Sequence, residues 1–194
     1  MFEDRDQRID LIALFLFGLT AFLGLSLLSY SPADPVGDFA PLSAVYQPKP
    51  VVYPPSEQVG NMCGAAGAFL ADMTLTVFGW GAHYIFASLT VLAFCLLFRR
   101  PMRSPLPRVF GWVMTLFAIA TFSNMFTHSL WSGPVIGPGG YLGALCTGIL
   151  NQHFALPGSV IITFSVMLAG VLLCTDYLMF QLLGIVGAAS VDRV

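Results

Sequence analysis

Charged residues are scarce in this sequence of 194 residues. Only 9% of the residues are Asp, Glu, Lys or Arg, and the net charge is −2. About 25% would be usual in a soluble globular chain, which needs that charge on its surface. Because 57% of the residues are hydrophobic and the mean hydropathy is +0.81, the composition excludes an ordinary soluble domain and predicts a membrane protein.

Motifs that hold phosphates, metals or catalytic nucleophiles are also missing. The sequence has no GxxxxGK[ST], HExxH or GxSxG pattern and no grouping of Ser, His and Asp. We therefore expect no catalytic, cofactor-binding or metal-binding residues in this chain. His83, His128 and His153 have spacings that suit no recognised ligand set and are expected near the outer surface. No basic stripe that could follow nucleic-acid phosphates is present.

The four cysteines lack the CxxC spacing of metal and redox sites. Cys95 and Cys174 lie inside apolar runs, where we expect them to act as small hydrophobic side chains. Cys63 and Cys146 both fall near one membrane face. A disulfide between these two residues therefore stays open at this point.

Four apolar runs are long enough to cross a bilayer, whose hydrocarbon core of about 30 Å needs about 20 helical residues. The spans are expected at residues 9–30, 82–98, 109–127 and 158–183. A cleaved signal peptide is the rival interpretation of the first run. It is disfavoured because acidic residues balance Arg5 and Arg8 and no small-residue cleavage site follows Tyr30.

Two further apolar segments are too short to be extra spans. As one helix, residues 62–98 would be about 55 Å long, far more than the bilayer core, and the glycines of "FGWGAH" (78–83) divide them. Pro157 divides the later run in the same way. We expect short helices at residues 63–78 and 140–152 that lie in the outer interface, with outer loops at residues 31–62 and 128–139.

The distribution of arginine and lysine predicts the orientation. The tail 1–8, the loop 99–108 and the tail 184–194 share one side of the membrane if there are four spans. That side holds Arg5, Arg8, Arg99, Arg100, Arg103, Arg108 and Arg193, and the other side holds Lys49 alone. By the positive-inside rule both termini are cytoplasmic.

The two halves of the chain are similar in sequence. Residues 64–98 align with residues 140–174 at an offset of 76, so that Gly64 matches Gly140 and Gly67 matches Gly143. We therefore expect an all-α fold with two parallel two-span repeats, each with one short helix at the outer face. Small residues recur four positions apart, which favours close helix packing, in the pairs Gly64/Ala68, Gly67/Ala71, Gly139/Gly143, Gly140/Ala144 and Ser165/Ala169. We expect these faces to close the two halves against each other.

Asp72 is the ionisable residue that most needs an explanation. Inside a span it would suggest a proton or ion path. On an interfacial helix it can reach water or cap the neighbouring backbone, and Thr74 and Thr76 lie nearby. We favour the structural role. Asp176 falls near the cytoplasmic end of the last span, where it can reach lipid headgroups.

Three patterns follow spans in a fixed order: S-Y-x-P-x-D-P, then N-x-x-G-x-x-G-A-x-x-A-D, then F-G-x-x-A. They are met at Ser29, Tyr30, Pro32, Asp34 and Pro35, at Asn61, Gly64, Gly67, Ala68, Ala71 and Asp72, and at Phe78, Gly79 and Ala82. The later stretch "GPGGYLGALC" adds Gly140 and Gly143. Together they resemble the N-terminal membrane region of the FtsK/SpoIIIE family of bacterial DNA translocases.

The resemblance implies a membrane anchor for a cytoplasmic ATP-driven motor that pumps double-stranded DNA during cell division. ATP and Mg would belong to that motor, for which residues 184–194 leave no room, so this chain is not expected to be an enzyme. Its implied partners are the bilayer of the bacterial inner membrane, other division proteins at the septum and further copies of itself, with DNA reached only through the motor. A small transporter or channel subunit, and a membrane scaffold unrelated to division, are the alternatives.

Overall fold

The computed structural model describes residues 7–35, 56, 58–98, 105–127, 131 and 133–174. Within these residues it contains six α-helices and no strand, which confirms the all-helical prediction. The helices are α1 (Gln7–Leu28), α2 (Gly64–Phe78), α3 (Gly81–Leu97), α4 (Pro105–Phe126), α5 (Gly140–His153) and α6 (Leu156–Cys174). The tails, most of the loop 99–108 and residues 175–183 of the last expected span lie outside the described residues.

Three of these helices are long and apolar enough to cross a membrane, namely the segments Asp10–Leu28, Leu106–Phe126 and Leu156–Cys174. A fourth crossing is available if α2 and α3 are counted as one broken span, with a bend of 113° between them. The helices therefore make a multi-pass membrane protein with three or four candidate spans.

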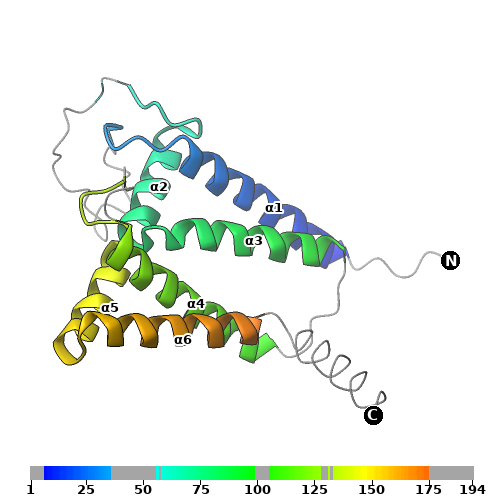
Figure 1. The fold of residues 1–194 in the computed structure, drawn as a ribbon. Coiled ribbons are helices and arrows are strands. Elements are labelled where there is room, and N and C mark those ends of the chain that lie inside the picture. Colours follow the sequence, from blue (N-terminus) through cyan, green and yellow to red (C-terminus); the bar gives the residue numbers. More distant parts are fainter. Residues whose placement is uncertain are drawn as a thin grey trace, which may run out of the picture.

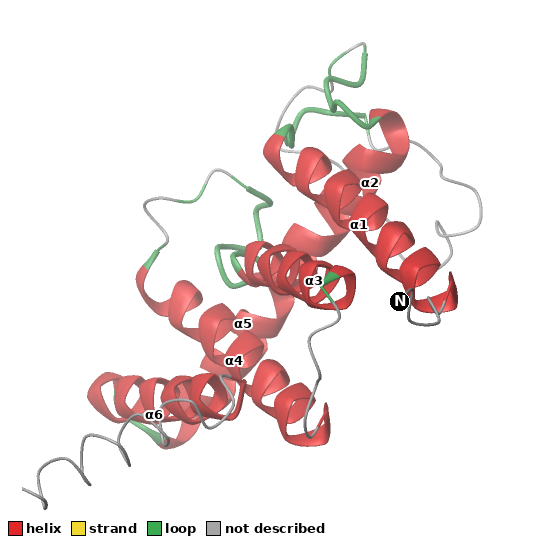
Figure 2. Ribbon diagram, turned by 90° about the vertical axis from the view of Figure 1, so that its right-hand side faces the viewer, coloured by secondary structure: helices red, strands yellow, loops and turns green. Residues whose placement is uncertain are grey.

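The six helices form two halves, α1 to α3 and α4 to α6. In Figure 1, α1, α3, α4 and α6 run roughly side by side, and α2 and α5 lie across them at one end of the molecule. Both α1 and α4 begin at the opposite end, where α3 and α6 finish. Figure 2 shows α1 and α2 grouped on one side of the molecule and α4, α5 and α6 on the other, with α3 between them.

The breaks after α2 and α5 use different residues. Gly79 follows α2 with φ 56°, in the left-handed region that favours glycine, and its N–H donates to the Leu75 carbonyl at 2.8 Å. After α5, Phe154 is extended, and Pro157 occupies the first turn of α6, where its missing N–H costs nothing. The long apolar runs therefore turn sharply at both places where the sequence was expected to divide.

The turns that begin α2 and α5 have the same backbone geometry. Gly64 has φ 67° and Gly140 has φ 61°. The Gly64 N–H donates to the Asn61 carbonyl at 2.9 Å, and the Gly140 N–H donates to the Gly137 carbonyl at 3.1 Å. Each donor and acceptor in one half is thus 76 positions from its counterpart in the other.

The spans pack through small residues. A Cβ atom placed on Gly111 of α4 would lie 2.7 Å from the Gly170 carbonyl oxygen of α6, and one on Gly170 would lie 2.9 Å from the Gly111 oxygen. The two backbones therefore touch, as small residues allow in membrane helices. In the first half, an apolar cluster joins α1, α2 and α3 and consists of Leu23, Leu27, Ala71, Leu75 and Ala82.

The expectation that the small-residue faces close the two halves against each other is wrong for most of them. Gly67 faces Ser26 of its own half, and Gly143 faces Ala120 of its own half. Ser165 is exposed and donates to the Ile161 carbonyl of its own helix. Gly140 does reach across, because its neighbours are Val77 and Gly79 of the other half. The reason is that each short helix lies directly on the span that precedes it.

Five buried hydroxyl groups in the spans are satisfied by their own helices, whereas the buried Ser159 hydroxyl of α6 has no hydrogen-bond partner among the described residues. Each of five buried side chains donates to the carbonyl four residues earlier at 2.7 or 2.8 Å, namely Thr20, Ser26, Thr115, Thr121 and Thr163. This arrangement lets a hydroxyl sit in an apolar surrounding without a partner from another helix.

Candidate functional site

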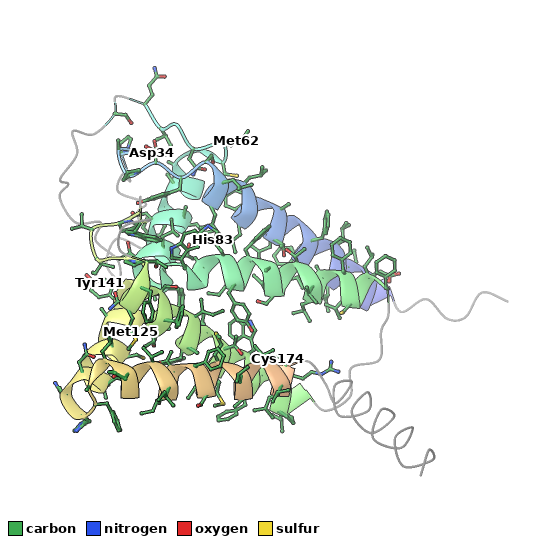
Figure 3. The ribbon with its side chains drawn as sticks, viewed as in Figure 1. Asp34, Met62, His83, Met125, Tyr141 and Cys174 are labelled. Atoms are coloured by element: carbon green, nitrogen blue, oxygen red, sulfur yellow. The ribbon has the colours of Figure 1, made fainter. Side chains whose placement is uncertain are left out.

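The motif residues gather in two clusters at the end of the molecule where α2 and α5 lie. The first, which we call the clasp, joins the end of α1 to the start of α2 and comprises residues 26–34, 56 and 60–67. The second, which we call the junction, joins the two halves and comprises residues 77–80 and 137–140. Figure 3 shows Asp34 and Met62 in the clasp.

Asn61 lies at the centre of the clasp and is only 5% exposed. Its Nδ2 donates to the Ser26 carbonyl at 2.9 Å and to the Ser29 carbonyl at 3.4 Å. Its Oδ1 accepts the Cys63 N–H at 3.0 Å. Because the last carbonyls of a helix have no partner within it, this one side chain closes α1 and begins the turn into α2.

Ser29 and Tyr30 bind α2 from the other side of the clasp. The Ser29 Oγ donates to the Leu25 carbonyl at 2.7 Å and accepts the Met62 N–H at 3.0 Å. The Tyr30 hydroxyl donates to Asp72 Oδ1 at 3.0 Å. Asp72 therefore joins α2 to the segment that follows α1, which supports the structural role over an ion path.

The first residues after α1 form a turn that carries the Ser/Pro/Asp motif. The Asp34 N–H donates to the Ser31 carbonyl at 3.2 Å, which places Pro32 second in the turn, where its fixed φ fits. Asp34 is buried, and its Oδ1 accepts the Gly60 N–H at 2.9 Å. Ser56 donates to the Ala33 carbonyl from its N–H at 2.8 Å. The end of the outer segment therefore lies against this turn just before α2 begins. Pro35 is the residue that follows the turn.

Gly67 is the position at which the clasp leaves no room for a side chain. A Cβ atom there would lie 2.5 Å from Asn61 Oδ1 and 2.8 Å from Ser26 Oγ. Ala68 and Ala71, on the same helix, are buried. The small residues of the motif thus allow α2 to lie against α1 while Asn61 keeps its hydrogen bonds.

The junction is a contact between two stretches of backbone. The Trp80 N–H donates to the Pro138 carbonyl at 2.8 Å. A Cβ on Gly140 would lie 2.7 Å from both the Gly79 nitrogen and the Val77 oxygen, and a Cβ on Gly79 would overlap the Pro138 oxygen. Glycine is therefore required on both sides, and Pro138 is fully buried between the halves.

The remaining motif residues flank these two clusters. Phe78 ends α2 within the junction, and Ala82 is buried in the apolar cluster of the first half. Gly143 of α5 has no room for a side chain, because a Cβ there would overlap the Ala120 oxygen of α4. The sequence patterns thus coincide with the contacts that hold each short helix in place.

The residues expected to set the topology are not part of either cluster. Arg99, Arg100 and Arg103 lie outside the described residues. Arg108 belongs to the first turn of α4, and its carbonyl accepts a weak hydrogen bond from Cys174 Sγ at 3.6 Å. Arg108 therefore lies at the end of the bundle opposite α2 and α5.

The structure answers the open question about the cysteines. All four cysteines are free, so Cys63 and Cys146 are not joined by a disulfide. Within the described ranges no group of three or more His, Cys, Asp or Glu side chains could hold a metal ion. His83 lies against Trp80, with ring centroids 5.0 Å apart and ring planes tilted by 37°, and His128 lies outside the described residues.

Sequence reasoning missed several residues of these clusters. Ser26 was detectable as a polar residue in an apolar run, one turn before Ser29. Ser56, Pro138 and the Gly111–Gly170 contact carried no comparable signal. Their importance depends on a partner distant in sequence, which spacing alone does not reveal.

A family model described as the 4TM region of DNA translocase FtsK/SpoIIIE matches residues 6–187. The chain belongs to this family. The matched range contains the six helices of the described residues, the clasp and the junction.

Curated relatives in the FtsK/SpoIIIE family are much longer than this chain. The DNA translocase FtsK of Pseudomonas syringae pv. syringae (strain B728a) is 27% identical over 199 residues, which cover 98% of this chain and 23% of the relative. The DNA translocase FtsK of Pseudomonas putida (strain KT2440) is 27% identical over 182 residues, which cover 90% of this chain and 20% of the relative. The DNA translocase FtsK of Azospirillum brasilense is 26% identical over 162 residues, which cover 81% of this chain and 23% of the relative. No solved structure matches the chain.

Proposed function

We propose that this chain is the membrane-anchoring and assembly region of a cell-division DNA translocase. It tethers a cytoplasmic ATP-driven pump for double-stranded DNA at the septum, where chromosomes are segregated. The observation that carries this proposal is the family match over residues 6–187. The curated relatives covered by the chain to 20–23% of their length are each named a DNA translocase.

The proposal includes four crossings of the bacterial inner membrane with both termini in the cytoplasm. In this arrangement α1, α3, α4 and α6 span the bilayer, and α2 and α5 lie at the outer interface. Arg8 in the first turn of α1 and Arg108 in the first turn of α4 support it. Both turns lie at the end of the bundle away from α2 and α5 (Figure 1), as the positive-inside rule requires.

The use of polar groups in the structure favours an anchor over a transporter. Asp72, the acidic residue of α2, is bonded to Tyr30. Five buried hydroxyls of the spans donate to carbonyls of their own helices, which satisfies them without a partner from an ion path. A fixed bundle of this kind suits a tether that must transmit force to the bilayer. We accordingly propose other division proteins and further copies of the chain as its partners.

Localisation in dividing cells tests the proposed function. The chain is fused at its C-terminus to a fluorescent protein and expressed at low level in a Gram-negative bacterium, beside an unrelated multi-span inner-membrane protein with the same fusion. We expect a band at the division site for this chain and an even membrane signal for the control. Equal, uniform membrane signals from both proteins would contradict septal tethering. The purified chain is expected to show no ATPase activity above background.

A further inference from the structure

The short helices α2 and α5 follow one another in the same direction. In Figure 1, α2 passes from the level of α1 to that of α3, and α5 continues from the level of α4 to that of α6. The end of α2 meets the start of α5 at the junction, where Trp80 donates to Pro138. The two halves of one chain are therefore joined head to tail, and not through a shared symmetric face.

A head-to-tail contact between two similar units leaves one half of the same contact unused at each end. We call the bend between a short helix and the span after it an elbow. The α2–α3 elbow contributes Gly79 and Trp80 to the junction. The corresponding residues of the α5–α6 elbow, 76 positions later, are Ala155 and Leu156. The loop side, Pro138 to Gly140, has counterparts at Met62 to Gly64, 76 positions earlier. Each chain thus carries one completed junction and two surfaces that correspond to its two sides but have no partner among the described residues of the chain. One surface lies at the start of α2 and the other at the end of α5.

These two surfaces are exposed where the completed junction is buried. Pro138 is fully buried, whereas its counterpart Met62 is 76% exposed. Gly140 has no room for a Cβ atom, whereas nothing lies within 4 Å of a Cβ on Gly64, although both have the same left-handed backbone. Leu156 is 57% exposed, and every residue from 151 to 157 is exposed.

The flanking spans show the same contrast. Within the chain, α3 and α4 meet through the Trp112 Nε1, which donates to the Ser88 Oγ at 2.8 Å. The counterpart of Trp112 in α1 is Leu14, since α1 and α4 have equal lengths and bounds 98 positions apart. The counterpart of Ser88 in α6 is Phe164. These two side chains are 66% and 48% exposed, so an apolar pair replaces the polar one.

From this contrast we infer that a second copy of this chain docks on the α5–α6 elbow. The turn Met62–Gly64 of one copy packs on Ala155 and Leu156 of the next, and α1 of one copy lies beside α6 of the other. The inference rests on the proposed assembly role and names the surface that carries it. The contact between copies continues the internal junction, because it uses the corresponding residues of each half.

A heterologous contact of this kind adds copies in one direction and ends only when a ring closes. The copy-to-copy contact cannot match the internal one atom for atom. Ala155 carries a methyl group where Gly79 has none, and a Cβ at Gly79 would overlap Pro138. The turn at Met62 must therefore stand slightly farther from the elbow, which makes the contact between copies weaker than the junction within a chain.

Cysteine cross-linking in membranes tests the surface directly. The four native cysteines are replaced by serine, and the pair Met62→Cys and Leu156→Cys is introduced into the full chain. These positions correspond to Pro138 and Trp80, whose backbones are hydrogen-bonded within the chain. We expect a mild oxidant to give a ladder of dimers, trimers and larger species. The two single variants should give no ladder, and their mixture should stop at the dimer.

The matched control combines Met62→Cys with Tyr141→Cys. Tyr141 is also exposed and lies at the same end of the molecule, at the start of α5 (Figure 3), but the inferred contact does not include it. We expect no ladder from this pair. A blocking change, Ala155→Trp, should abolish the ladder, whereas Ile149→Trp, at an exposed position outside the contact, should leave it unchanged.

Absence of a ladder from the Met62/Leu156 pair, or equal dimer yields from the single variants, would overturn the inferred surface. Equal dimers would indicate a symmetric interface instead. The septal localisation experiment is read independently of this one. Septal localisation without a ladder removes the inferred contact alone, whereas a ladder without septal localisation removes the division role.

Discussion

At the residue scale, Asn61 satisfies three backbone groups with one side chain. Two are the Ser26 and Ser29 carbonyls at the end of α1, and the third is the Cys63 N–H at the start of α2. A helix end buried without such partners is costly. The tightness of the clasp therefore depends on the amide and not on the size of the side chain.

We predict that Asn61→Ala lowers the free energy of unfolding by about 1–3 kcal/mol, because it leaves buried backbone groups without partners. Asn61→Asp should lose stability as well, since it keeps the acceptor but removes the donor. The measurement is denaturant unfolding of the detergent-solubilised chain, with Gln152→Ala at an exposed position as the control. Equal stability of Asn61→Ala and the control would show that the clasp adds little.

The second prediction at this scale concerns Gly67, with Gly148 as the control position. Gly67→Ala places a Cβ 2.5 Å from Asn61 Oδ1, whereas Gly148→Ala meets nothing within 4 Å. We expect Gly67→Ala to cost about 1–3 kcal/mol through overpacking. Gly148→Ala should instead stabilise α5 by up to about 1 kcal/mol, because alanine is the better helix former.

Thermal unfolding of both variants in the same detergent measures the difference. Two changes of the same sign and size would contradict the packing of α2 on α1.

The sequence patterns identified Asn61 and Gly67 but not what they do. Both belong to a motif that follows a span, and motif membership requires no knowledge of contacts. Ser26 and Ser56 belong to the same clasp and were not identified. The Ser26 carbonyl accepts from Asn61, and the Ser56 N–H donates to the Ala33 carbonyl. Both contacts depend on how the outer segment returns, and residue type and spacing do not record that path.

At the element scale, the turns that begin α2 and α5 have the same backbone conformation in different surroundings. Gly64 and Gly140 have φ values of 67° and 61° and make the same backbone hydrogen bond. They differ in surroundings, because Gly140 faces Val77 and Gly79 of the other half and Gly64 faces open space. A comparison of the two isolates the junction from the local cost of the turn.

We predict that Gly140→Ala destabilises the monomeric chain more than Gly64→Ala does. Both variants carry the left-handed penalty of roughly 1–2 kcal/mol. Only Gly140→Ala adds a clash with backbone atoms 2.7 Å away, which cannot rotate aside as a side chain can. Unfolding of each variant in a detergent that keeps the chain monomeric measures the difference.

Equal losses from these two variants would show that the halves are not interlocked at Gly140.

The lengths of the apolar runs and the positions of glycine and proline were sufficient to divide them. The expected short helices at residues 63–78 and 140–152 correspond to α2 (Gly64–Phe78) and α5 (Gly140–His153), while their interfacial position stays a prediction. Helix partners were harder to predict. Gly111 and Gly170 touch across α4 and α6, but two isolated glycines in different helices give no signal that they meet.

At the scale of the whole molecule, the fold consists of two halves of three helices each, with the short helices at one end. The class of fold followed from composition, and the family followed from the order of short motifs, which the match over residues 6–187 confirms. How the halves join did not follow, because Pro138 and Trp80 are distant in sequence and their contact is made by backbone atoms. Membrane orientation stays a prediction that rests on arginine and on the shared end of α1 and α4.

Labelling of single cysteines in intact cells tests the central claim most directly. In a chain without native cysteines, Ser56→Cys and Val135→Cys lie on the side of α2 and α5, and Ser104→Cys lies in the loop between α3 and α4. A membrane-impermeant maleimide should label the first two in intact cells and should label Ser104→Cys only after the cells are opened. Labelling of Ser104→Cys in intact cells, with Ser56→Cys and Val135→Cys protected, would contradict the proposed anchor.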